Sequence, residues 1–225
     1  MVGSVISIKY HPDYETVCKS LHIEDELREE YQPVYESCVE VSNPKAAYCI
    51  QEVKQDGDNT WIGDSCFSSR IMYKNFEGIH RAFVYVATCG SELYNLGIHA
   101  KDDLDKWWIE QFSQEAMKFV LSEMMTSIQE KYDIGHMASM NPGSIPEFPL
   151  KYQKELFHLI EKETAQIGMQ LTSSYLMLPH KSVSGFLYET DKNFVNCQLC
   201  PRKNCPERRA RFDINKVQDY GLDLR

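Results

Sequence analysis

Three cysteines near the end of this 225-residue chain form its most compact group of potential metal ligands. Their spacing is Cys197-x-x-Cys200-x-x-x-x-Cys205. A Cys-x-x-Cys pair can place two thiolates on one metal ion, and a third can close from the next turn. A fourth ligand would have to come from Cys66, Cys89, His180 or an exogenous molecule. The spacing predicts an iron–sulfur cluster, a structural zinc or a set of free or redox-active thiols, and it does not choose among them.

The remaining five cysteines are scattered along the chain: Cys18, Cys38, Cys49, Cys66 and Cys89. In a reducing compartment such cysteines behave as small hydrophobic residues, so we expect them to lie in the core as free thiols.

A second group of segments lies mostly after a predicted long helix. It comprises Asn141-Pro142-Gly143 with residues 148–150 (FPL), then residues 167–174 (IGMQLTSS), and then residues 177–185 (MLPHKSVSG). Upstream, residues 87–90 (ATCG) end a predicted strand, and residues 115–123 (EAMKFVLSE) belong to the helix. In order and spacing these segments resemble the reactivation domain of cobalamin-dependent methionine synthase and its stand-alone versions. The resemblance covers roughly residues 80–213, and its most specific part is Met-x-Pro-x-x-Ser-Val-Ser-Gly.

The resemblance implies a function. Members of this family bind S-adenosylmethionine in a shallow site and dock on a corrinoid protein whose cobalamin has drifted to Co(II). One electron from a donor protein gives Co(I), which takes the methyl group from S-adenosylmethionine. The reacting centre is the cobalt of the partner, so no catalytic residue is expected in this chain. Because the reaction consumes an electron, the resemblance also makes an iron–sulfur cluster at the three cysteines attractive.

The resemblance also implies cofactor-binding residues. Glu115 matches a family glutamate that contacts the cofactor, where a carboxylate suits the ammonium or ribose hydroxyls. Pro142 and Gly143 match a turn of the family, and glycine there lets the backbone approach a ligand. Asn141 and Ser144 flank that turn and are included in the predicted site. Phe194 falls one position from a family tyrosine that packs near the adenosine, although an aromatic residue on a strand is more often part of the core.

Two departures from the family pattern Arg-x-x-x-Gly-Tyr bear on S-adenosylmethionine. Ser139 replaces an arginine that can hold a carboxylate with a bidentate fork, and Ser144 replaces the tyrosine. Lys151, Lys181 or an arginine of the tail are the candidate replacements. If none serves, the alternative is a non-catalytic docking or electron-transfer module that has lost S-adenosylmethionine.

Charge and hydropathy limit the partners. The net charge is -9 and the pI about 5.3, which argues against a nucleic-acid binder. The chain contains no apolar run near the roughly 20 residues that span a bilayer, and it starts without a secretory signal, so a cytoplasmic protein is expected. A basic patch occurs in the tail and is either solvated or a docking surface for an acidic corrinoid or electron-transfer protein. Its members are Arg202, Lys203, Arg208, Arg209 and Arg211.

Periodicity and turn residues predict an α+β fold. We expect a single domain over residues 1–225, with a mixed or antiparallel sheet and surrounding helices, because strands occur on both sides of the long helix. Within it we distinguish an amino-terminal part (1–80), an activation-domain-like core (80–196) and a cysteine-cluster tail (197–225). The expected helices are residues 25–41, 66–73, 101–132 and 151–166. The expected strands are residues 48–53, 60–62, 81–89, 182–188 and 194–198, the last two forming a hairpin.

Overall fold

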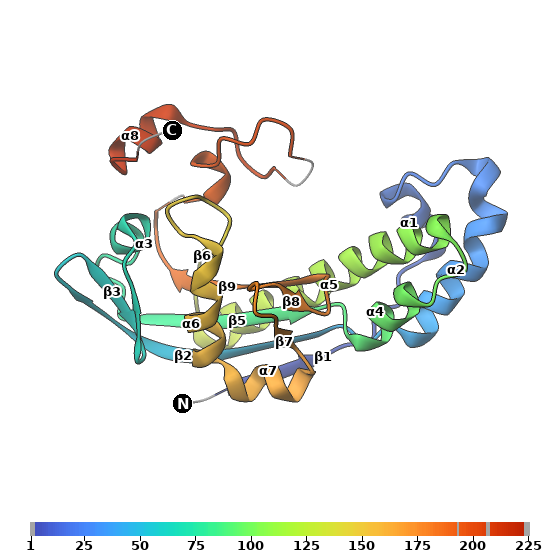
Figure 1. The fold of residues 1–225 in the computed structure, drawn as a ribbon, viewed down its shortest axis with the longest axis horizontal. Helices are drawn as coiled ribbons and strands as arrows, with labels where there is room; N and C mark the ends of the chain where they lie inside the picture. The colour runs from blue at the N-terminus through green and yellow to red at the C-terminus, as the bar shows by residue number, and fades with distance from the viewer. Residues whose placement is uncertain (1–2, 193, 206–207, 223–225) are drawn as a thin grey trace.

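The structure, a computed structural model, describes residues 3–192, 194–205 and 208–222. Within these residues seven strands form one antiparallel sheet, in the order β4-β3-β2-β5-β9-β6, with β1 also paired to β2 (Figure 1). The strands are β1 (Gly3–Ser7), β2 (Lys45–Asp56), β3 (Asn59–Ile62), β4 (Ser65–Phe67), β5 (Arg81–Thr88), β6 (Met137–Met140) and β9 (Ser182–Glu189). A separate two-stranded ribbon joins β7 (Gln170–Leu171) and β8 (Met177–Leu178).

Helices cover both faces of the sheet (Figure 1). The long helix α5 (Asp103–Tyr132) lies on one face, and α6 (Gln153–Leu159) and α7 (Glu161–Ile167) lie on the other. The start of α5 extends beyond the sheet and packs against α1 (Tyr14–Ser20), α2 (Arg28–Val41) and α4 (Ser91–Ile98), which together form a helical arm. The short helices α3 (Arg70–Asn75) and α8 (Ile214–Asp219) lie at the opposite end.

Strand β5 shows why its sequence is apolar throughout. Val84 and Val86 face α6 and α7, whereas Phe83 and Tyr85 face α5. Successive side chains of a strand point to opposite faces, so a strand covered on both faces buries both sets. The central position of β5, between β2 and β9, follows from this pattern.

The predicted α+β class and the antiparallel sheet are confirmed. The predicted hairpin of residues 182–188 and 194–198 is wrong, because β9 pairs with β5 and β6, and residues Asn196–Gln198 form a 3-10 turn. Five strands of the described residues were not expected: β1, β4, β6, β7 and β8. Of these, β6 lies inside a segment predicted to be a loop. The predicted helix 66–73 is instead β4 followed by α3.

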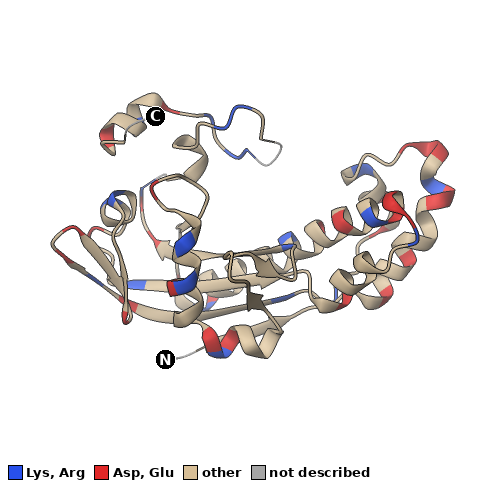
Figure 2. Cartoon of the chain, in the orientation of Figure 1, with Lys and Arg blue, Asp and Glu red and all other residues tan. Residues whose placement is uncertain are grey.

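Charge is unevenly distributed. Acidic residues gather on the helical arm, whereas the loop around residues 202–211 is basic (Figure 2). Among the described residues, none of the helices has the length and apolar character required to cross a bilayer. Of the scattered cysteines, four are buried free thiols as expected and Cys66 is half-buried.

Candidate functional site

The turn after β6 is held closed by hydrogen bonds within residues 141–148. Gly143 has a φ of 82°, a left-handed conformation that glycine adopts without strain. Its N–H donates to the Phe148 carbonyl at 2.7 Å, and the Ser144 hydroxyl donates to the Asn141 carbonyl at 2.6 Å. A Cβ at Gly143 would lie 3.0 Å from the Leu150 side chain. The sequence prediction of a tight turn at Pro142-Gly143 therefore agrees with the backbone.

The side chain of Asn141 anchors this turn to the sheet. Its amide nitrogen donates to the Tyr85 hydroxyl at 2.7 Å and to the Ser184 carbonyl at 2.8 Å, and its oxygen accepts from the Asn196 amide at 3.3 Å. Burial raises the pKa of Tyr85 to about 12, so its hydroxyl stays neutral at pH 7. Asn141 thus has a structural role whether or not it also touches a ligand.

Gly185 is required for this arrangement. A Cβ there would lie 2.5 Å from the Asn141 amide nitrogen, 2.6 Å from the Met140 carbonyl oxygen and 2.9 Å from the Tyr85 ring. The glycine that ends the Met-x-Pro-x-x-Ser-Val-Ser-Gly segment therefore leaves room for Asn141 and Tyr85 to meet across β9.

A shallow cleft of about 550 Å³ lies beside the turn. Its lining combines the turn with the loop that carries the three clustered cysteines (residues 197–211, the cysteine loop). The lining residues are Gly143, Ser144, Ile145, Pro146, Pro149, Leu150, Cys200, Pro201 and Arg202. The structure thus brings two of the predicted cofactor-binding residues next to one predicted metal ligand. It also places an exposed arginine at the cleft.

The guanidinium of Arg208 organises the cysteine loop. It donates to the carbonyl of Cys197 at 3.0 Å, of Cys200 at 3.3 Å and of Ala210 at 3.2 Å, and also to the carbonyl of Arg202. Arg208 was predicted as part of an exposed basic patch. This prediction needs correction, because its donors are committed to backbone carbonyls within its own loop.

The three cysteines are half-buried free thiols. Burial opposes ionisation of Cys197, but the N–H groups of Arg209 and Ala210 and then the Arg209 guanidinium outweigh it and lower its pKa. Among the residues that the structure describes, no group of three or more His, Cys, Asp or Glu side chains is arranged to hold a metal ion. The arrangement therefore lends no support to the predicted metal site, which stays a prediction.

Glu115 and Phe194 lie apart from the cleft. Glu115 is on α5, where it forms an ion pair with Lys118 at 3.1 Å. The pKa of Tyr10 is raised mainly by the burial of its hydroxyl and secondly by the negative charge of Glu115. Phe194 is buried in the core, with its ring 5.9 Å from that of Tyr220. Neither lines the cleft, so the six predicted cofactor-binding residues are not gathered at one point.

The candidate replacements for the missing arginine differ in position. Lys151 lies over the Tyr152 ring at 5.5 Å, and Lys181 forms an ion pair with Glu110 at 3.6 Å. Only Arg202, of the basic residues predicted as replacements, is among the described residues that line the cleft.

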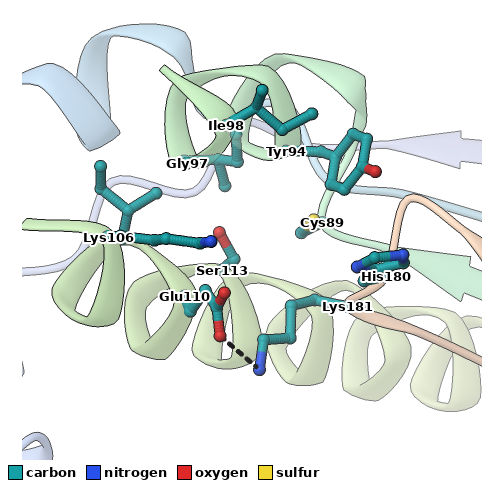
Figure 3. Close-up of a pocket in the computed structure, with 11 residues that line it drawn as sticks. Cys89, Tyr94, Gly97, Ile98, Lys106, Glu110, Ser113, His180 and Lys181 are labelled. Atoms are coloured by element: carbon teal, nitrogen blue, oxygen red, sulfur yellow. Dashed lines mark ion pairs between the residues drawn. The ribbon is translucent and has the colours of Figure 1, made fainter. Parts of the chain in front are cut away.

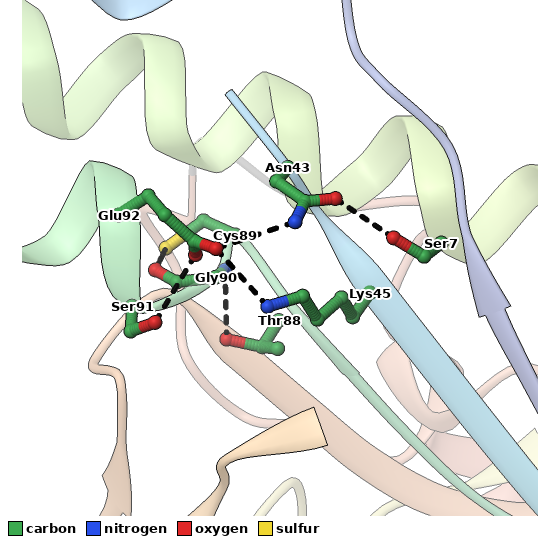
Figure 4. A network of polar contacts seen from close by, with 8 residues as sticks. All are labelled: Ser7, Asn43, Lys45, Thr88, Cys89, Gly90, Ser91 and Glu92. Carbon is green, nitrogen blue, oxygen red and sulfur yellow. Dashed lines mark hydrogen bonds and ion pairs between the residues drawn. The ribbon is translucent and has the colours of Figure 1, made fainter. Parts of the chain in front are cut away.

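The end of β5 holds a separate polar network (Figure 4). Gly90 has a φ of 93°, and a Cβ there would lie 2.6 Å from the Asn43 carbonyl oxygen. Glu92 accepts from Lys45 and Asn43, both at 3.2 Å. Burial opposes ionisation of Glu92, yet its own backbone N–H, Lys45 and Asn43 together lower its pKa. The network fixes the start of α4 against β2.

Sequence reasoning missed a more enclosed cavity between α4 and α5 (Figure 3). Its volume is about 300 Å³. Two of the family-like segments contribute to its lining: Cys89 comes from residues 87–90, and His180 and Lys181 come from residues 177–185. Their resemblance to the family was the signal in the sequence that could have indicated this cavity.

Comparisons with known proteins agree with the predicted resemblance. Residues 111–207 match the family described as vitamin B12 dependent methionine synthase, activation domain. The fold is similar to a solved structure entitled "Crystal Structure of the MetH Reactivation Domain bound to AdoHcy", with a TM-score of 0.57 and 13% identity. The similarity covers 98% of this chain and 86% of the other. A comparison with curated proteins finds no match.

Proposed function

Because residues 111–207 of this chain belong to the activation-domain family of vitamin B12-dependent methionine synthase, we propose that the protein reactivates a corrinoid protein. In the proposed reaction a donor protein supplies one electron, which reduces Co(II) to Co(I) on the partner. The Co(I) centre then attacks the methyl group of S-adenosylmethionine, giving methylcobalamin and S-adenosylhomocysteine. The family match carries this proposal, since it spans the turn after β6 and all three clustered cysteines.

The cleft beside the turn fits part of S-adenosylmethionine. A volume of about 550 Å³ lies within the usual range of ligand sites. The exposed Arg202 guanidinium offers a bidentate partner for the methionine carboxylate, the group that the family arginine would hold at position 139. Gly143 leaves the backbone open to close approach. We therefore assign the binding of the methionine carboxylate to Arg202, because Ser139 has no guanidinium to bind it.

An anaerobic calorimetric titration with S-adenosylmethionine tests this assignment. Hydrogen bonds to charged groups contribute about 1.5–3 kcal/mol, so Arg202→Met should weaken binding by at least about tenfold. Lys203→Met is the matched control, since it removes a neighbouring cation that does not line the cleft. Loss of affinity in Glu115→Ala but not in Arg202→Met would place the cofactor at α5 instead.

The alternative is a docking or electron-transfer module without S-adenosylmethionine. The serines at positions 139 and 144 favour it, because neither can replace an arginine fork or a tyrosine ring. A folded protein that shows no saturable binding of S-adenosylmethionine but still binds a corrinoid partner would support this alternative.

For the cysteine loop we propose an iron–sulfur cluster or zinc, with free thiols as the remaining alternative. Support comes from the Cys-x-x-Cys spacing and from the proximity of Cys200 to the cleft. Iron, sulfide and zinc should be determined in protein purified without oxygen. A metal that is retained by the native chain and lost from Cys197→Ser with Cys200→Ser would support a site. Protein free of all three elements would leave free thiols.

A further inference from the structure

The cavity between α4 and α5 is a candidate binding site that shares no residue with the cleft, the turn or the cysteine loop (Figure 3). It is also bounded by the segment that enters β9. The residues that line it are Cys89, Leu93, Tyr94, Gly97, Ile98, Lys106, Ile109, Glu110, Ser113, His180 and Lys181. Its volume of about 300 Å³ is at the lower end of the range for small-molecule sites, so only a small ligand would fit.

Part of the lining is apolar, and a glycine leaves space beside it. Leu93 and Ile98 from α4 and Ile109 from α5 provide the apolar lining, and Gly97 lies in α4 between Leu93 and Ile98 in sequence. Glycine in a helix is unfavourable relative to alanine. A Cβ at Gly97 would meet only the Ile109 side chain, at an ordinary contact distance of 3.5 Å. Packing therefore does not require a glycine here, and its effect is to leave space in the cavity.

The charged side chains of the lining carry a net positive charge. Lys181 forms an ion pair with Glu110 at 3.6 Å, and Lys106 extends across the cavity toward Ser113 (Figure 3). Burial raises the pKa of the Cys89 thiol to about 11, so it adds no negative charge at pH 7. Two lysines against one glutamate favour an anion.

We propose that this cavity binds a small organic carboxylate that carries an apolar chain. The carboxylate lies between Lys106 and Lys181, with the Ser113 hydroxyl as a further donor, and the chain lies against Leu93 and Ile109. The assignment does not rest on the proposed corrinoid function, because it depends on the shape and charge of the cavity alone.

The test is an NMR titration of the full chain with 4-methylpentanoate, compared with 4-methylpentan-1-amine, which has the same chain and the opposite charge. For a ligand of about eight non-hydrogen atoms, a dissociation constant on the order of 1 mM is expected. Saturable shifts with the acid and none with the amine are the expected result. Equal binding of both compounds, or no saturation by the acid, overturns the proposal.

Variants with opposite effects sharpen the test. Lys106→Met should weaken binding of the acid about tenfold, whereas Glu110→Gln should strengthen it severalfold, since it removes a negative charge and frees Lys181. Gly97→Leu should abolish binding by filling the cavity, with Gly97→Ala as the check on folding. Lys101→Met is the matched control, because Lys101 is exposed and outside the lining. Unchanged affinity in both Lys106→Met and Glu110→Gln contradicts the proposal.

Discussion

Asn141 donates a 2.7 Å hydrogen bond to the hydroxyl of Tyr85, across the strand that lies between them in the sheet. The contact joins the turn after β6 to the central strand β5. The geometry of the candidate cleft therefore depends on a pair of residues that do not line it.

Asn141→Ala should destabilise the protein by about 1–3 kcal/mol, because it leaves the buried Tyr85 hydroxyl without its partner. Urea unfolding measures this loss. In a double-mutant cycle with Tyr85→Phe, the two changes should be coupled by at least about 0.5 kcal/mol. Additive effects would mean that the hydrogen bond does not hold the turn.

Gly185→Ala should cost about 1–3 kcal/mol or prevent folding, because the new Cβ would overlap the Asn141 amide and the Met140 carbonyl. Gly135→Ala is the matched control, since a Cβ there meets nothing within 4 Å. Circular dichroism during thermal unfolding compares the two. Equal melting temperatures for both variants would contradict the close packing at Gly185.

Arg208→Lys should loosen the cysteine loop, because an ammonium group cannot reproduce the guanidinium contacts to several carbonyls at once. Limited proteolysis should cut residues 197–211 about tenfold faster in this variant, as expected for easier local opening. Arg211→Lys, which keeps the charge at a neighbouring exposed position, should be cut at the native rate.

The sequence predicts the helices and strands that have a clear pattern of apolar residues. It does not predict the elements whose structure depends on contacts with distant parts of the chain. The apolar run of β5 and the helical spacing of the apolar residues in α5 identify both elements. Residues 137–140 pair with β9 only because the chain returns there after the long helix, and four residues between loops carry too little pattern to show it. Phe194 is aromatic and apolar, as a strand residue would be, but it packs in the core beside an irregular segment.

Some features of the candidate site could likewise be predicted from the sequence, and others could not. The Pro142-Gly143 turn was predictable because a positive φ has a strong residue preference. The engagement of Arg208 with backbone carbonyls was not, since a run of basic residues has the same composition whether it faces solvent or folds its own loop. The cavity behind α4 was also hidden, because its walls come from segments far apart in the chain.

Glu92 should make the stability of the protein depend on pH. Its pKa is lowered in the folded state from the usual 4.5, so its contribution is fully present above that value and is lost as the pH falls through the folded-state pKa. The destabilisation caused by Glu92→Gln should therefore be measurable at pH 7 and shrink below pH 4.5. Glu123→Gln, at an exposed position on α5, is the matched control. Urea unfolding across this range provides the measurement.

Reversing the charge of Lys203 and Arg211 to glutamate should slow association with an acidic corrinoid partner, with less effect on dissociation, because exposed charges act mainly on the encounter. Stopped-flow mixing at two salt concentrations separates the rates. Lys9→Glu with Lys19→Glu, two exposed lysines outside the tail, is the control. Association rates that are equal in all three proteins would argue against docking through the tail.

The separation of acidic arm and basic tail loop has a physical consequence for any charged partner (Figure 2). A molecule with opposite charge at two distant places carries an electric dipole moment, and the field of a partner exerts a torque on it. The protein would turn its tail loop toward a negative surface before contact, although its net charge of -9 repels that surface overall. This orientation acts over about 8 Å at physiological ionic strength, so added salt should weaken the preference for one face before it affects the fold.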